Sequence, residues 1–97
     1  MSKERIPVDA AIIDEAVDDF RQKLCDRLQE KGDLSFIGPH EIYGVISEEY
    51  HELDQAVRGN NEGEVKDELL DIAVGAVFGY ASLLQYKLDS TQRKVKG

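Results

Sequence analysis

Apolar residues recur every three or four positions along three stretches of the chain, which is the spacing of one face of an α-helix. The first stretch predicts a helix over residues 9–31, with Asp9 as its N-cap and Gly32 as the residue that ends it. The second predicts a helix over residues 39–58, because proline is favoured at the first helical position and Gly59 follows the last.

The third apolar stretch predicts a helix that begins after Asn61 and ends near Leu88. Asn61 and Glu64 have the spacing of a capping box, in which side chains bind backbone N–H groups at the helix start. Residues 72–84 are apolar on every side of this helix, which predicts burial all round. A break at residues 80–82, giving a short fourth helix, is the alternative.

The short connections between these segments predict an all-α fold, an antiparallel helix bundle of three long helices. Gly75 and Gly79 form a G-x-x-x-G pattern that indicates close helix packing, either in the core or at a subunit interface. We expect one domain over residues 1–97, with a core over 9–88 and a basic tail over 89–97. Because an apolar helix in so small a bundle leaves surface to cover, we expect a homodimer or homotetramer to complete it.

Acidic side chains outnumber basic ones and are concentrated in one segment. The 97 residues include 20 acids and 12 bases, so the formal net charge is −8. Residues 41–71 contain ten of these acids and only two bases, Arg58 and Lys66. This balance lacks the basic surface that binds nucleic acid or an anionic membrane, so we expect neither partner.

Three features of the sequence lead us to expect a cytoplasmic protein. Cys25 is the only cysteine, so no internal disulfide can form. The N-terminal sequence lacks the apolar core and cleavage site of a signal peptide. The longest apolar run, residues 72–84, is shorter than the roughly 20 residues that a membrane-spanning helix needs.

Carboxylates interrupt the apolar faces of the second and third helices. At about 100° per residue, Glu49 lies in the middle of the apolar stripe of the second helix, and Glu48 and Glu52 lie beside it. On the third helix, Glu68 and Asp71 are three residues apart and share one side, where a solvated end meets the apolar run.

A carboxylate in an apolar core costs several kcal/mol unless it is paired, and two bases are too few for these five acids. A divalent cation resolves the conflict, since hard cations prefer oxygen ligands and Mg²⁺ is commonly held by carboxylates together with phosphates. We therefore expect Mg²⁺ as the cofactor, with Mn²⁺ as a substitute. The competing interpretation is an ordinary solvated glutamate face.

Two short motifs carry these acids, EEYHE at residues 48–52 and ELLD at residues 68–71. Together they resemble the E-E-x-x-E…E-x-x-D signature of the MazG-like nucleotide pyrophosphohydrolases, which are all-α NTP pyrophosphatases. The similarity includes the helix, short turn and helix around the motifs, and it covers residues 42–80. Each half of the signature is common in helices, whereas both halves with this gap are more specific.

The resemblance implies a helical dimer or dimer of dimers that hydrolyses a (d)NTP to the (d)NMP and pyrophosphate, clearing non-standard or excess nucleotides. The acidic positions of the signature are the implied metal ligands: Glu48, Glu49, Glu52, Glu68 and Asp71. Glu48 and Glu49 are the expected catalytic residues. A water held by a carboxylate would attack the α-phosphorus, and Glu48, at the edge of the stripe, is the candidate general base.

The end of the chain departs from the pattern. Longer MazG-like proteins follow the second motif with a basic segment, whereas this chain has QYKLDSTQRKVKG. Lys87, Arg93 and Lys94 are the candidates for phosphate contacts, within one chain or across a dimer. The competing interpretation, which we favour, is a fraying basic tail.

A different class of function fits the same sequence. The acidic surface could bind a basic partner while the long apolar helix drives oligomerisation, with no catalysis. This alternative predicts no nucleotide turnover and no stabilisation by Mg²⁺, because only a ligand that binds the folded state raises its stability.

Overall fold

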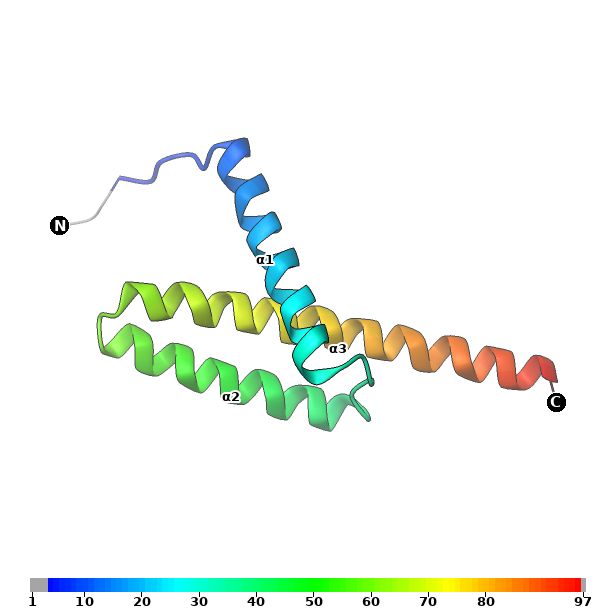
Figure 1. The fold of residues 1–97 in the computed structure, drawn as a ribbon. Coiled ribbons are helices and arrows are strands. Elements are labelled where there is room, and N and C mark those ends of the chain that lie inside the picture. Colours follow the sequence, from blue (N-terminus) through cyan, green and yellow to red (C-terminus); the bar gives the residue numbers. More distant parts are fainter. Residues whose placement is uncertain (1–3, 97) are drawn as a thin grey trace.

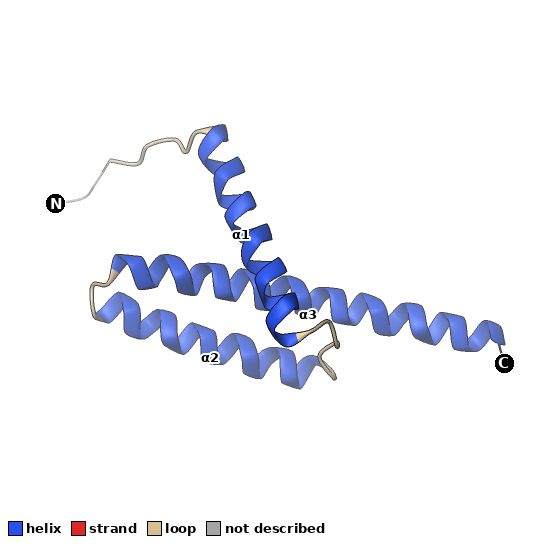
Figure 2. Cartoon of the chain, in the orientation of Figure 1, coloured by secondary structure: helices blue, strands red, loops and turns tan. Residues whose placement is uncertain are grey.

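The computed structural model describes residues 4–96, with the side chains of residues 4–87 and of Asp89. Over this range the chain forms three helices and no strand: α1 (Ala10–Lys31), α2 (Pro39–Arg58) and α3 (Glu62–Lys96). The predicted all-α class is therefore confirmed. α2 and α3 form an antiparallel hairpin, and α1 crosses α3 near its middle (Figure 1, Figure 2).

The local signals in the sequence place most of the helix ends correctly. Gly32 ends α1 with a left-handed φ of 80°, and its N–H donates to the Leu28 carbonyl at 2.9 Å. α2 begins and ends at the predicted residues. At the start of α3, the Asn61 side-chain oxygen accepts a hydrogen bond from the Glu64 N–H at 3.0 Å, as the capping box predicts. Asp9 is the N-cap of α1, but its side chain makes no capping hydrogen bond.

The C-terminal end of α3 corrects the predicted boundary. The helix continues to Lys96 rather than ending near Leu88, and residues 80–82 show no break. The polar residues after Leu88 do not stop a helix, because no glycine or proline occurs among them before Gly97 and Gln, Arg and Lys are good helix formers.

The core of the single chain is small and lies mainly between α2 and α3. Its buried apolar side chains are Phe36, Ala56, Val74 and Phe78. The rings of Phe36 and Phe78 meet edge-to-face at 5.1 Å between centroids. Ser82 is also buried, and its hydroxyl accepts a hydrogen bond from the Phe36 N–H at 3.0 Å while donating to the Phe78 carbonyl at 2.9 Å.

The G-x-x-x-G pattern lets α2 and α3 approach closely. A Cβ atom at Gly79 would lie 2.8 Å from Cγ2 of Ile42, and one at Gly75 would lie 3.2 Å from Cδ1 of Ile46. Of the two uses that the sequence left open, the structure shows packing inside one chain.

Large apolar surfaces stay exposed on the single chain. The prediction that residues 72–84 are buried all round is wrong for one chain, because Val77, Tyr80 and Leu84 lie on an exposed face of α3. Ile13 and Val17 on α1 are 51% and 42% exposed. The radius of gyration is 17.1 Å, against about 12.5 Å for a compact domain of this length. An oligomer that covers these faces stays a prediction.

One segment of α3 meets the length and composition of a membrane-crossing helix. This segment, Glu62–Lys87, passes a test that the core helices of soluble proteins also pass. One of its faces packs against α2 in the hairpin, through Gly75 and Gly79.

Candidate metal centre

The hairpin of α2 and α3 brings three of the predicted ligands together. Glu49 comes from α2, and Glu68 and Asp71 come from consecutive turns of α3. One carboxylate oxygen from each residue lies within 4.8 Å of the other two. All three side chains are half-buried. We call these three residues the carboxylate cluster.

Glu48 and Glu52 lie beside the cluster and are exposed to solvent. The negative charge of Glu52 raises the pKa values of both Glu49 and Glu68, and Glu52 also shares a hydrogen bond with Glu68. The negative charge of Glu48 also raises the pKa of Glu49, and its effect is smaller than those of Asp71 and Glu52. The five predicted residues therefore lie at different distances from the centre of the site, with the carboxylate cluster at the centre, Glu52 next to it and Glu48 at the rim.

Two members of the cluster, Glu49 and Glu68, have pKa values above that of an isolated glutamate. Burial, a hydrogen bond with Glu49 and the negative charge of Glu52 raise the pKa of Glu68 to about 7. Burial and the charges of Asp71 and Glu52 also raise the pKa of Glu49, against the opposing effect of its hydrogen bond with Glu68. Such shifts mean that burial and the neighbouring acids disfavour the charged forms of Glu49 and Glu68.

Two oxygens of the cluster are buried without a protein donor. Oε2 of Glu49 and Oε2 of Glu68 have no hydrogen-bond partner among the residues that the structure describes. The hydrogen bond between the two carboxyl groups needs a proton on one of them. A hard divalent cation would satisfy both oxygens at once, so the residues present fit such an ion.

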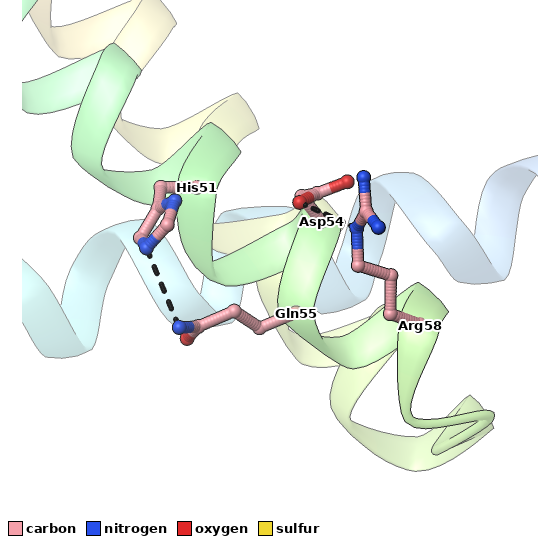
Figure 3. A network of polar contacts seen from close by, with 4 residues as sticks. All are labelled: His51, Asp54, Gln55 and Arg58. Atoms are coloured by element: carbon pink, nitrogen blue, oxygen red, sulfur yellow. Dashed lines mark hydrogen bonds and ion pairs between the residues drawn. The ribbon is translucent and has the colours of Figure 1, made fainter.

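Lys23 of α1 contacts the cluster, and the sequence analysis did not identify it. Its Nζ lies 3.0 Å from Oδ1 of Asp71 and donates to the Asp67 carbonyl at 3.3 Å. Arg58, one of the two bases in residues 41–71, pairs with Asp54 at 3.0 Å on another face of α2, where His51 and Gln55 also meet (Figure 3).

A cavity of about 420 Å³ opens between α1 and the hairpin, next to the cluster. Glu49 and Asp71 line one side of it. The α1 side carries three basic residues, Lys23, Arg27 and Lys31, and two acidic ones, Asp26 and Glu30. This volume lies within the range of about 300–1,000 Å³ that small-molecule sites have.

The predicted phosphate contacts lie far from the cluster within one chain. At 1.5 Å per residue, Lys87 lies about 24 Å beyond Asp71 along α3, and Arg93 lies about 33 Å beyond it. The side chains of Arg93 and Lys94 fall outside the described part of the structure. A contact from these residues across a dimer stays a prediction.

Comparisons with known proteins do not assign the chain to a family. Protein-family models, curated proteins and solved structures all give no match. The resemblance to MazG-like proteins therefore depends on the motifs at residues 48–52 and 68–71 and on the geometry that brings them together.

Proposed function

We propose that this protein is a Mg²⁺-dependent nucleoside triphosphate pyrophosphohydrolase of the MazG-like type. The observation that carries the proposal is the convergence of Glu49, Glu68 and Asp71 beside a cavity that Lys23, Arg27 and Lys31 of α1 also line. Carboxylates hold a hard cation, and cationic side chains in the same cavity can pair with the phosphates of an anionic substrate. Cytoplasmic nucleotides are the proposed substrates.

The five acidic residues divide into three roles in this proposal. Glu49, Glu68 and Asp71 hold the metal, and Glu52 adds negative charge next to them. The bound metal would supply positive charge to the phosphates and to the leaving pyrophosphate. Glu48, exposed at the rim, accepts a proton from the attacking water, whose oxygen bonds to the α-phosphorus as the bond to the bridging oxygen breaks.

The test is hydrolysis of a panel of (d)NTPs by the full chain in Mg²⁺. Pyrophosphate is measured by a coupled phosphate assay, and the monophosphate by ion-exchange chromatography. We expect Glu49→Gln and Asp71→Asn to lower kcat/KM by about a hundredfold or more, since each leaves the ion short of a charged ligand. Glu64→Gln is the matched control, because Glu64 lies on α3 outside the cluster and is exposed.

Two results would refute the assignment. One is no turnover of any nucleotide in Mg²⁺ or Mn²⁺ by folded protein. The other is wild-type turnover by both cluster variants, which would move the active site elsewhere.

The exposed apolar faces of α1 and α3 favour a second candidate, a non-enzymatic helical oligomerisation module. It predicts the same assembly without nucleotide chemistry. A melting series with Mg²⁺ and a triphosphate whose α,β-bridge cannot be hydrolysed separates the two, because only the enzyme gains stability from both ligands together.

A further inference from the structure

We propose that α1 supplies the polyphosphate-binding side of the cavity through Lys23, Arg27 and Lys31. This inference rests on the proposed function for the identity of the ligand as a substrate. It assigns phosphate binding to residues of the first helix rather than to the basic end of the chain. The three residues are hereafter called the α1 basic row.

Lys23 and Arg27 of the row contact α3 through Asp71 and Phe78, and Figure 1 shows α1 crossing α3. The members of the row are four residues apart, so they project from successive turns of the same face. All three line the cavity together with Glu49 and Asp71 of the hairpin. A metal-bound triphosphate, with cation and anion side by side, matches a cavity that offers both carboxylates and cationic side chains.

Arg27 is held in position by aromatic rings. Its guanidinium carbon lies 4.0 Å from the centroid of the Phe78 ring and 5.4 Å from that of Phe36. These contacts fix the group without using its hydrogen-bond donors. Its Nη1 is buried with no hydrogen-bond partner among the described residues. The planar fork of donors on arginine matches phosphate oxygens closely.

Lys23 binds a carboxylate, Asp71, that is also a proposed metal ligand. Its ammonium group lies 3.0 Å from Oδ1 of Asp71, where it neutralises one carboxylate of the cluster. When Asp71 binds a divalent cation, the ammonium group would lose its ionic partner and keep the Asp67 carbonyl as an acceptor, beside the cavity. It is then placed to pair with a phosphate that accompanies the metal.

The charges that line the cavity predict that metal and polyphosphate bind together. The lining carries the three basic residues and four acidic ones, Asp26 and Glu30 on α1 and Glu49 and Asp71 on the hairpin, so its formal net charge is −1. The metal-free cavity therefore repels a polyphosphate, and one Mg²⁺ makes the net charge positive. By linkage, polyphosphate then raises the affinity for Mg²⁺ by the same factor.

The test measures binding of inorganic tripolyphosphate and of Mg²⁺ to the full chain by isothermal titration calorimetry. We expect the wild type to bind tripolyphosphate in Mg²⁺ and not in EDTA. Lys31→Ala should weaken this binding by about tenfold or more, as expected for loss of a charge-assisted hydrogen bond. Arg21→Ala is the control, because Arg21 is exposed and lies about 120° around α1 from Arg27.

Lys23→Gln gives a result that a merely structural role would not. It should weaken tripolyphosphate binding by about tenfold while leaving Mg²⁺ affinity equal or stronger, since the ammonium group no longer competes for Asp71. Arg27→Lys keeps the charge next to the rings and removes the fork, so its loss of affinity reports on the arginine geometry rather than on folding.

The outcomes separate this inference from the proposed function. Nucleotide turnover with wild-type KM and unchanged tripolyphosphate affinity in Lys31→Ala and Lys23→Gln overturns the α1 basic row and leaves the hydrolase standing. A larger loss from Lys87→Ala also overturns it, in favour of the tail. Tripolyphosphate binding that depends on the row, without turnover of any nucleotide, supports the site and refutes the hydrolase. Absence of both binding and turnover refutes both.

Discussion

Binding of Mg²⁺ to the carboxylate cluster should release protons, and the amount should depend on pH in a defined way. The pKa of Glu68 is raised to about 7 by burial, its hydrogen bond with Glu49 and the charge of Glu52. A carboxylate must be ionised to bind a metal, so each ion that enters expels whatever proton Glu68 carries. From that pKa, release is about 0.9 proton per ion at pH 6, about 0.5 at pH 7 and about 0.1 at pH 8.

The assay is titration calorimetry with Mg²⁺ in two buffers of different ionisation enthalpy at each pH, which yields the number of protons released. Affinity for Mg²⁺ should rise by nearly tenfold per pH unit below about pH 7 and level off above it. Glu64→Gln is the control and should keep the full pH dependence. A proton count that is zero, or that is equal at pH 6 and pH 8, would refute the assignment of Glu68 as a ligand.

The same shift predicts how the stability of the metal-free protein changes with pH. The pKa of Glu68 is higher in the folded state than its ordinary value of 4.5, so the folded protein binds more protons between these values. The contribution of Glu68 to the free energy of unfolding is therefore fully present below pH 4.5 and is lost as pH rises through about 7. In EDTA at pH 8, Glu68→Gln should melt above the wild type, and the gap should close toward pH 5. A gap that widens on acidification would contradict the sign.

Three further predictions concern the packing of the helices. Gly79→Ala should destabilise the protein by about 1–2 kcal/mol in urea unfolding, because its Cβ would lie 2.8 Å from the β-branched methyl of Ile42. Gly44→Ala, with nothing within 4 Å, should instead stabilise by about 0.5–1 kcal/mol, and equal effects at both positions would refute the close contact. Ser82→Ala should cost about 1–3 kcal/mol by leaving the Phe36 N–H without its acceptor, and a Ser82→Thr variant of equal cost would point to packing instead. Sedimentation should give two or four times the 10.9 kDa chain mass, and a monomer at micromolar concentration would refute the expected oligomer.

The carboxylate cluster could be predicted because its two halves are each encoded locally. The position of Glu49 within an apolar stripe follows from helical periodicity, and Glu68 and Asp71 share a side for the same reason. The short turn between the helices then forces the two halves to face each other. Glu48 and Glu52 follow the same periodicity but point toward the rim, because helix angles do not specify how deeply a side chain at the edge of a stripe is covered.

The sequence analysis did not identify the α1 basic row, although helical periodicity marks two of its residues in the same way as it marks Glu49. At about 100° per residue, Lys31 falls inside the apolar stripe of α1 and Arg27 lies about 20° from its edge. The rule that singled out Glu49 therefore also singles out these two residues. What the sequence does not specify is which part of α1 meets α3, since that contact joins residues more than 40 positions apart, as between Lys23 and Asp67.

The contacts that hold α1 on the hairpin near the cavity are the same ones that a ligand would exchange. Lys23 bridges to Asp71, and Arg27 lies over the Phe78 ring. In the proposed function, a metal ion bound to Asp71 would compete with Lys23 for that carboxylate and would weaken the contact of α1 with the hairpin. A polyphosphate bound with the metal would give Lys23 a new ionic partner and would restore part of that contact, so the position of α1 would depend on both ligands.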